Sequence, residues 1–334
     1  DRTIQYVACS ALQKAVAKHQ ADGGSVVIIE PDTGKVLAMC GAPDFDPNDY
    51  RDVPDFSVFN NPATFKDYEP GSIFKSITIA AALDTGAVTP STTYEDTGAV
   101  QIDEYTIKNS DLLSHGVQTM TEALEKSLNT GMIFAMRETG QETFTKYVKA
   151  FGFGERTGVE LDTEMPGDVR PLDIGSEVYA ATASFGQGIT VTPLQMAAAY
   201  AAIANGGILK RTTIVEEIRH PDGQVEKHPT EDVRRVVDAK TARLLGAMLV
   251  SVIEHGHGKL ASVPGYYIAG KTGTAQVAKK NEAGYEEDDT IGSFAGFGPV
   301  ENPKFVMVVR IDHPRDAPWA ESTAAPLFGE IAAF

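Results

Sequence analysis

The sequence predicts a mixed α/β protein of the α+β kind, with helices flanking one antiparallel sheet and a helical lobe inserted into the chain. Strand-like runs open and close the 334-residue chain, whereas helical patterns fill its middle. The simplest sheet therefore combines the first hairpin with the last three strands. A hydrophobic content of 42% is enough for a large core, as one domain or two closely joined lobes.

The first elements follow from periodicity and turn residues. Residues 4–18 carry apolar side chains at helical spacing, which predicts an amphipathic helix. The apolar runs 25–29 and 36–40 flank Pro31-Asp32-Thr33-Gly34, so they predict a β-hairpin. Residues 42–55 contain three prolines and several aspartates and are expected to be a loop.

The rest of the chain is assigned in the same way. Helices are expected at 72–84, 119–126, 128–138, 141–151, 193–205, 239–254 and 320–334. The glycine-rich tract 152–192 is expected to be largely loop, and residues 212–228 to form a second hairpin. The closing strands are expected at 266–277, 291–299 and 305–311.

Charge and cysteine content narrow the class of protein. A formal net charge of −17 repels phosphate backbones, so no nucleic-acid partner is expected. Cys9 and Cys40 are too few for a disulfide framework; Cys40 is expected to be a small buried hydrophobic residue, and whether the two pair is left open. No apolar stretch is long enough to cross a bilayer. Because the chain begins at Asp1 without a methionine, we expect a cut or processed form, and the missing anchor says nothing about the full-length protein.

Three short motifs, each present once, carry the candidate chemistry. In order they are Ser72-Ile73-Phe74-Lys75, Ser127-Leu128-Asn129 and Lys271-Thr272-Gly273. Alone, each has an ordinary explanation: a helix N-cap serine with a surface lysine, a second N-cap, and a plain strand. Together they supply a nucleophile, a base, a proton shuttle and an anion anchor, and this ordered trio is a known catalytic signature.

Ser72 and Lys75 are the expected nucleophile and base. Ser72 opens an apolar helix, and Lys75 lies one turn further on the same face, from where it can reach the Ser72 hydroxyl. A lysine accepts a proton only when it is neutral. Burial beside Phe74 and the nearness of the Lys271 cation are both expected to lower the pKa of Lys75.

The other two motifs are expected to handle protons and substrate. Ser127 can relay a proton between Lys75 and an amine, and Asn129 can hold a peptide amide. On the strand, Lys271, Thr272 and Thr274 are expected to bind a substrate carboxylate. Gly273 would let a ligand lie against the backbone. The backbone N–H groups of Ser72 and Thr274 are expected to form an oxyanion hole.

Two weaker sequence signals do not indicate a binding site. The run His255-Gly256-His257-Gly258 has no third ligand near it in sequence, so its histidines are expected to be solvated loop residues rather than a metal site. Gly152-Phe153-Gly154 follows no strand and is not a dinucleotide fingerprint. No metal or cofactor is expected.

The chain resembles the transpeptidase domain of class B penicillin-binding proteins, from Gly24 to the C-terminus. The resemblance rests on the three motifs and on five further runs. These runs are Glu30 to Met39, Tyr68 to Lys75, Ser184 to Gly188, Val191 to Ala197, and Phe294 to Phe297; Gly270 to Gln276 extends the third motif. Ile73 replaces the threonine usual in the family, at a spacer position.

The resemblance implies a five-stranded antiparallel sheet between helices, one transpeptidase domain over residues 1–334, and a helical subdomain over residues 72–210. It implies D,D-transpeptidation: the serine attacks a peptidoglycan stem peptide, releases the terminal D-alanine, and passes the acyl group to an amine of a neighbouring stem. β-Lactam antibiotics would trap the serine.

The resemblance also implies a setting for the domain. Family members usually carry an N-terminal membrane anchor and a pedestal domain, neither of which is in this sequence. Their catalytic domain lies outside the cytoplasmic membrane and works with a polytopic membrane glycosyltransferase and division proteins. The tract 181–207 is more similar to the septal, cell-division branch than to the elongation branch.

Two alternatives remain open. A serine β-lactamase would need a carboxylate that drives water onto the acyl-enzyme, and the nearest candidate, Glu164-Met165-Pro166-Gly167, lacks the class A pattern. A β-lactam sensor, or a scaffold without activity, would bind without turnover. The complete set of motif residues argues against the inactive scaffold but not against a sensor.

Overall fold

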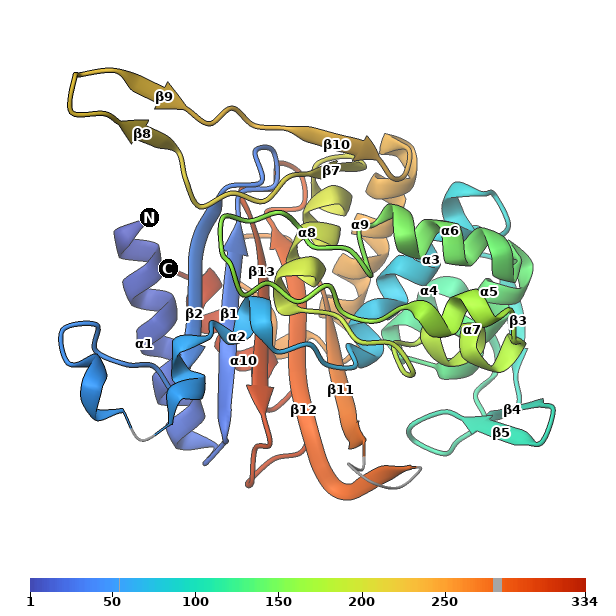
Figure 1. Ribbon diagram of the computed structural model, residues 1–334. Helices are drawn as coiled ribbons and strands as arrows, with labels where there is room; N and C mark the ends of the chain where they lie inside the picture. Colours follow the sequence, from blue (N-terminus) through green and yellow to red (C-terminus); the bar gives the residue numbers. More distant parts are fainter. Residues whose placement is uncertain (54, 279–283) are drawn as a thin grey trace.

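The computed structural model describes residues 1–53, 55–278 and 284–334. Its centre is a five-stranded antiparallel sheet with the strand order β11-β12-β13-β1-β2 (Figure 1). The predicted combination of the first hairpin with the last three strands is therefore confirmed. The strands are β1 (Gly23–Ile29), β2 (Val36–Ala42), β11 (Ala269–Ala278), β12 (Tyr285–Gly298) and β13 (Phe305–Asp312).

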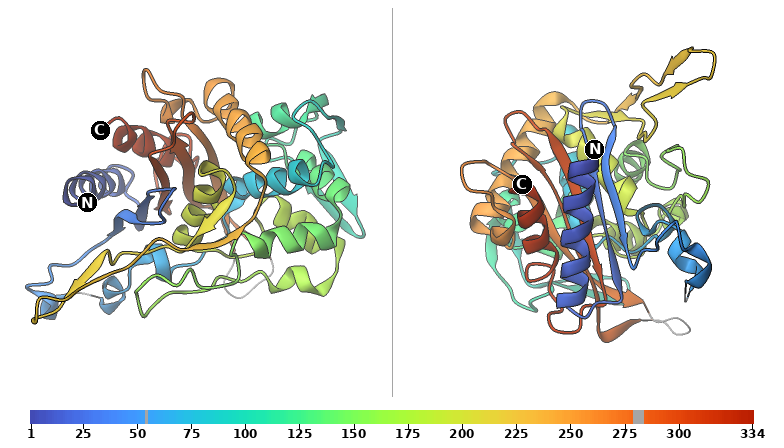
Figure 2. Two further views of the ribbon diagram at one scale, coloured as in Figure 1. Left: turned by 90° about the horizontal axis from the view of Figure 1, so that it is seen from above. Right: turned by 90° about the vertical axis from the view of Figure 1, so that its left-hand side faces the viewer.

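Helices cover both faces of the sheet. The terminal helices α1 (Arg2–Lys18) and α10 (Ala324–Ala332) lie side by side on one face, as both views in Figure 2 show. On the opposite face packs α8 (Pro193–Ala204), with α9 (Ala239–His255) beside it against β11. All seven residues of β1 are buried because this interior strand faces an apolar core on each side.

A helical lobe lies beside the β11 edge of the sheet (Figure 1). Its helices are α3 (Lys75–Asp84), α4 (Met120–Glu125), α5 (Asn129–Thr139), α6 (Gln141–Ala150) and α7 (Glu177–Ser184). Two small antiparallel pairs belong to it, β3 (Thr93–Asp96) with β6 (Gly116–Thr119) and β4 (Ala99–Ile102) with β5 (Tyr105–Lys108).

The remaining elements are short. They are α2 (Pro62–Phe65), the pairs β7 (Ile208–Lys210) with β10 (Asp232–Arg235) and β8 (Glu217–Arg219) with β9 (Val225–Lys227), and the 3₁₀ helices η1 (Tyr50–Asp52), η2 (Phe56–Phe59), η3 (Gly71–Phe74), η4 (Arg170–Ile174) and η5 (Lys259–Ala261). Within the described ranges, no helix combines the length and the apolar character that crossing a membrane requires.

Several predicted elements differ from the structure. The tract 152–192 is largely loop, as predicted, but it also contains η4 and helix α7. The pairs β3–β6 and β4–β5 were not predicted, because strands of four residues are too short for alternation to show. β12 begins at Tyr285, before the expected residue 291, and residues 279–283 of the β11–β12 connection lie outside the described part.

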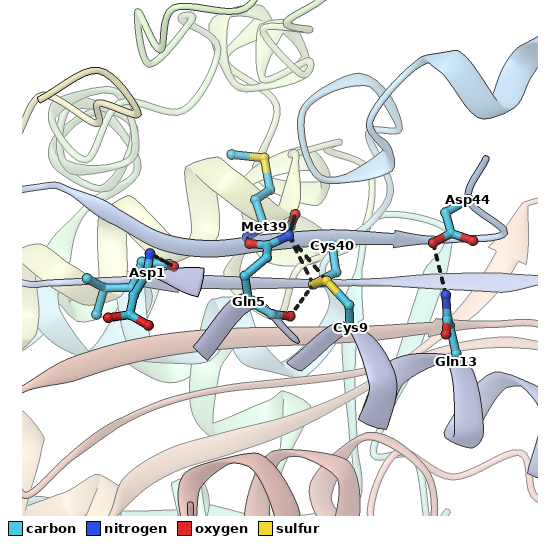
Figure 3. Close-up of a disulfide and its surroundings, with 8 residues drawn as sticks. Asp1, Gln5, Cys9, Gln13, Met39, Cys40 and Asp44 are labelled. Atoms are coloured by element: carbon cyan, nitrogen blue, oxygen red, sulfur yellow. Dashed lines mark hydrogen bonds between the residues drawn. A yellow bond between two sulfur atoms is a disulfide. The ribbon is translucent and has the colours of Figure 1, made fainter. Parts of the chain in front are cut away.

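Cys9 and Cys40 form a disulfide, the pairing that the sequence left open. Cys40 is buried as predicted, but it is one half of this bond and not simply a small hydrophobic residue. The bond ties α1 to β2, which is one of the two outer strands of the sheet (Figure 3). Beside it, the Gln5 side chain accepts a hydrogen bond from the Met39 backbone N–H at 2.9 Å and donates one to the Met39 carbonyl at 2.8 Å. These contacts pair the backbone N–H and carbonyl of Met39, at the free edge of β2, in the way a further strand would.

Candidate active site at the junction of sheet and lobe

Two buried lysines meet at one serine hydroxyl. Lys75 Nζ, from α3, donates to the Ser127 carbonyl at 2.5 Å and to Ser127 Oγ at 3.1 Å. Lys271 Nζ, from β11, donates to the same Ser127 Oγ at 3.0 Å and to the Thr272 carbonyl at 3.2 Å. Both lysine side chains are fully buried. The motif residues of the lobe and of the sheet edge are thus joined by direct hydrogen bonds.

Burial favours the neutral form of both lysines. It lowers the pKa of Lys75 well below the ordinary value, the nearby Lys271 cation lowers it further, and the Asp111 carboxylate acts in the opposite direction. Burial also lowers the pKa of Lys271, to about 7. A lysine in such surroundings reaches its neutral, proton-accepting form far more readily than an exposed one.

Ser127 owes its position to an unusual backbone conformation. It lies in the turn between α4 and α5, with φ at +57°, a region that few residues other than glycine adopt. The next residue, Leu128, is buried and its N–H donates to the Ala123 carbonyl at 2.8 Å. The turn is therefore fixed by its buried neighbour, and this holds the Ser127 hydroxyl toward both lysines.

Ser72 lies in the 3₁₀ turn η3, directly before α3, and is partly exposed. The turn packs on the sheet edge, because Gly71 lies against the Thr274 carbonyl and Ile73 against Gly273. The predicted contact between Lys75 and the Ser72 hydroxyl is not formed among the described residues, since Lys75 Nζ is directed at Ser127. Catalytic hydrogen bonds are often loose before substrate binds.

The strand residues after Lys271 have different surroundings. Thr272 is almost fully buried, and its hydroxyl makes no hydrogen bond to any described residue. Thr274 Oγ1 accepts a hydrogen bond from the Ala320 N–H at 3.0 Å. β11 is an outer strand of the sheet, so one of its edges is free of strand pairing and available to a ligand.

Close packing gives a structural reason for the two glycines of this strand. A side chain at Gly273 would meet the Pro70 carbonyl at 2.9 Å and Ser293 Oγ at 2.8 Å, and one at Gly270 would meet the Phe294 ring at 2.6 Å. Close packing of η3 and of the neighbouring strand therefore requires glycine here. This packing is a reason for glycine that the sequence did not show, and the expectation that a ligand lies against the Gly273 backbone stays a prediction.

Asn129 faces a different neighbour from Ser127. Its Nδ2 donates to the carbonyl of Lys108, at the end of β5, at 2.9 Å. Asn129 is the first residue of α5 and is partly exposed. It connects the motif turn to the segment that follows β5.

Glu69 was not predicted as a site residue, although it lies three residues before Ser72. Its carboxylate accepts hydrogen bonds from the Gly188 N–H at 3.0 Å and from the Tyr285 hydroxyl at 3.1 Å, and burial raises its pKa. Gly71 N–H also donates to the Gly186 carbonyl at 2.9 Å. Residues 186–188 and the start of β12 are thereby tied to the turn that carries Ser72. A carboxylate beside a predicted nucleophile was the available signal.

The residues of the weaker candidate sites have their hydrogen-bond partners outside the three motifs. Glu164 is buried and accepts hydrogen bonds from the Thr157 N–H, the Thr157 hydroxyl and the Gly158 N–H, so its carboxylate organises the 157–158 turn. His257 contacts Glu321, and His255 lies beside Ser251. A surface cavity of about 550 Å³ contains no motif residue and is lined by Lys149, Phe153, Gly154, Glu155, Pro166, Gly167, Asp168, Val169, Arg170 and Asp173.

A serine at a helix start, a lysine one turn later, and a second serine and lysine across a sheet edge define the class of serine acyl-transferring folds that includes penicillin-binding proteins and β-lactamases. Comparison with protein families is more specific. Residues 24–333 match the model of the penicillin-binding protein transpeptidase domain. The chain belongs to this family.

Comparison with individual curated proteins agrees with the family match. The chain is 38% identical to stage V sporulation protein D of Bacillus subtilis, over 99% of this chain and 52% of that protein. It is 32% identical to peptidoglycan D,D-transpeptidase FtsI of Buchnera aphidicola, over 99% of this chain and 56% of that protein. The chain thus spans about half the length of these curated relatives.

A solved structure shows the same fold. The chain superposes on penicillin-binding protein 3 of Mycobacterium tuberculosis, complexed with aztreonam, with a TM-score of 0.91 and 34% sequence identity. The match covers 99% of this chain and 76% of that chain. The predicted fold class is therefore confirmed by the sheet order and by this relative.

Proposed function

We propose that the domain is a peptidoglycan D,D-transpeptidase that works through a serine acyl-enzyme. The observation that carries the proposal is the Ser127 hydroxyl, which accepts hydrogen bonds from two buried lysines, Lys75 and Lys271, beside the turn that carries Ser72. This arrangement provides a base that is readily neutral and a hydroxyl that can pass on a proton. Family membership and relatives named as D,D-transpeptidases support it.

In the acylation step, Ser72 Oγ attacks the carbonyl carbon of the penultimate D-alanine of a stem peptide, and its proton passes to neutral Lys75. The C–N bond to the terminal D-alanine then breaks. The leaving nitrogen receives a proton through Ser127, which Lys75 recharges. The backbone N–H groups of Ser72 and Thr274 hold the oxyanion in this scheme.

In the second step, an amine of a neighbouring stem attacks the ester carbonyl. A new C–N bond forms and the C–O bond to Ser72 breaks. The amine proton returns through Lys75 to the Ser72 oxygen, which restores the free enzyme. Substrate binding in this scheme falls to Asn129 for the peptide amide, and to Lys271, Thr272, Gly273 and Thr274 along β11 for the terminal carboxylate.

We also propose the setting of the domain. Residues 1–334 form the transpeptidase domain, with 72–210 as its mainly helical subdomain, and the longer protein is membrane-anchored with this domain outside the cytoplasmic membrane. The Cys9–Cys40 disulfide supports this location, because disulfides persist in oxidising compartments. Partners are stem peptides and β-lactams, with a polytopic glycosyltransferase and division proteins for the septal role, and relatives named FtsI support that role.

Intact-protein mass spectrometry after addition of penicillin tests the function. We expect one covalent adduct on the peptide that contains Ser72, lost in Ser72→Ala and persisting for many minutes or longer in the wild-type chain. An adduct that remains in folded Ser72→Ala would refute the assignment of Ser72 as the nucleophile. Hydrolysis of nitrocefin at many turnovers per second would instead identify a β-lactamase. Acylation without peptide cross-linking of a D-alanyl donor would identify a sensor.

A further inference from the structure

The segment that begins with the last residue of β5, residues 108–115, lies beside the second motif. Asn129 Nδ2 donates to the Lys108 carbonyl at 2.9 Å, and the Thr130 N–H donates to Asn109 Oδ1 at 3.2 Å. Asn129 and Thr130 come two and three residues after Ser127. The segment is therefore anchored to the start of α5, next to the hydroxyl that bridges the two lysines.

A buried carboxylate fixes both ends of this segment. Asp96 is 1% exposed and accepts hydrogen bonds from Asn109 Nδ2 at 3.0 Å and from the His115 N–H at 3.0 Å. The Thr130 hydroxyl donates to the same carboxylate at 2.8 Å. Because one buried group holds residues 109, 115 and 130 together, the intervening loop has a defined position relative to α5.

Asp111 stands in the middle of this loop and is held in one orientation. Its Oδ1 accepts the Leu113 N–H at 3.0 Å, and its Oδ2 is hydrogen-bonded to His115 Nε2 at 2.8 Å. The carboxylate is 41% exposed, and no lysine or arginine among the described residues pairs with it. Its charge reaches the candidate active site, since it raises the pKa of Lys75 against the effect of burial.

In the second chemical step, the transfer of the acyl group to an amine, no residue of the three motifs offers a negative charge to bind a cationic acceptor. The acceptor is a primary amine, which is mostly an ammonium ion in neutral water. The charged groups of the three motifs are Lys75 and Lys271, which repel a cation when protonated. A fixed carboxylate at the edge of the site would attract the acceptor and hold it near the acyl-enzyme.

We propose that Asp111, oriented by His115, binds the ammonium group of the acceptor substrate; this inference rests on the proposed transpeptidase function. The bound ammonium releases one proton to water and becomes the neutral amine. Its nitrogen forms the bond to the acyl carbon, the C–O bond to Ser72 breaks, and its second proton passes through Lys75 to the Ser72 oxygen. Asp111 thus determines how well cationic acceptors compete with water.

The test measures how the acyl-enzyme partitions between aminolysis and hydrolysis. The 334-residue chain is acylated with a D-alanyl thioester, and D-alanine or hydroxylamine is added as acceptor. D-Alanine carries an ammonium at pH 7, whereas hydroxylamine is largely neutral. Chromatography gives the ratio of amide to acid product, and this ratio does not depend on the acylation rate.

We expect Asp111→Asn, which keeps the shape and the acceptor for the Leu113 N–H, to lower the ratio at least tenfold for D-alanine and less than twofold for hydroxylamine. His115→Gln should lower the D-alanine ratio severalfold, because it loosens the Asp111 carboxylate. Glu104→Gln removes an exposed carboxylate at the β4–β5 turn and serves as the matched charge control, with no selective loss.

Two results would overturn the inference. Equal losses for both acceptors, or no loss for either, would mean that Asp111 does not recognise the ammonium, while the transpeptidase function would stand. If the wild-type chain forms an acyl-enzyme but no amide with any acceptor, the proposed function fails and this inference fails with it.

Discussion

Lys75 directs both of its short hydrogen bonds at Ser127, one to the hydroxyl at 3.1 Å and one to the backbone carbonyl at 2.5 Å. A neutral lysine amine has two N–H donors and one lone pair. When Ser127 takes both donors, the lone pair is free to accept the proton of a nucleophile. Ser127 Oγ accepts hydrogen bonds from both Lys75 and Lys271, so its own proton is available to a leaving group.

Lys75→Arg should abolish most acylation, because an arginine cannot give up its proton near neutral pH. Loss of one general base lowers a rate by roughly 10²–10⁴, and the rate of penicillin adduct formation, followed by mass spectrometry, measures this. Lys14→Arg, at an exposed site on α1, is the matched control. Near wild-type acylation by Lys75→Arg would rule out the general-base role.

The low pKa of Lys271 predicts a pH dependence of stability. The folded chain releases this proton near pH 7, whereas the ordinary pKa is 10.5. Between these values the unfolded chain binds more protons, so the free energy of unfolding rises with pH. Relative to Lys271→Met, wild type should gain at most about 1.4 kcal/mol per pH unit.

Urea unfolding of both proteins at pH 7.5, 8.5 and 9.5 measures this difference, and Lys240→Met shows the general effect of removing an exposed lysine. A difference between wild type and Lys271→Met that stays constant with pH would show that Lys271 keeps its proton in the folded chain. A difference that falls as pH rises would contradict the sign.

Removing the disulfide should lower stability without changing the chemistry. Cys9 and Cys40 are 31 residues apart, and a crosslink over such a loop stabilises by about 2–4 kcal/mol. Penicillin acylation should be unchanged, because β2 and β11 are the two opposite edges of the sheet. Urea unfolding and acylation are measured for oxidised wild type, reduced wild type and Cys9→Ala. A reduced protein as stable as the oxidised one would show that the bond does not contribute.

The sequence could predict the sheet and select the motif residues that the fold brings together, because both leave local signals. The motifs are contiguous, and the strands have clear apolar runs. It could not predict that Gly273 is required by Pro70 and Ser293, since those contacts join distant segments. The Cys9–Cys40 bond depends likewise on how α1 lies on β2, which no spacing encodes.

Asp111 and Glu69, which the sequence did not point to, have the same explanation. Asp111 is an ordinary polar loop residue in the sequence, and only the Asp96 network brings its segment to α5. Glu69 appears in the sequence as part of a turn, and its role as a tie depends on Gly188 and Tyr285, which are remote in the chain. Residues whose roles depend on contacts with distant parts of the chain can therefore be identified only once the fold is known.

The last prediction concerns recognition of the substrate carboxylate by β11. Thr274 Oγ1 accepts a hydrogen bond from the Ala320 N–H, which leaves its own O–H free to donate, and the Thr272 hydroxyl makes no hydrogen bond to a described residue. Both hydroxyls can therefore donate to a carboxylate. A hydrogen bond to a charged group contributes about 1.5–3 kcal/mol. Thr272→Val, which keeps the shape, should therefore slow acylation by carboxylate-bearing β-lactams roughly tenfold or more.

The control for this prediction is in the ligand. An esterified or amidated β-lactam lacks the anion, so Thr272→Val should change its acylation rate much less than that of the free acid. Stopped-flow or mass-spectrometric rates for both ligands on both proteins complete a double comparison that cancels any general loss of activity. Equal losses for acid and ester would mean that Thr272 does not bind the carboxylate. The proposed placement of the substrate carboxylate on β11 would then be wrong.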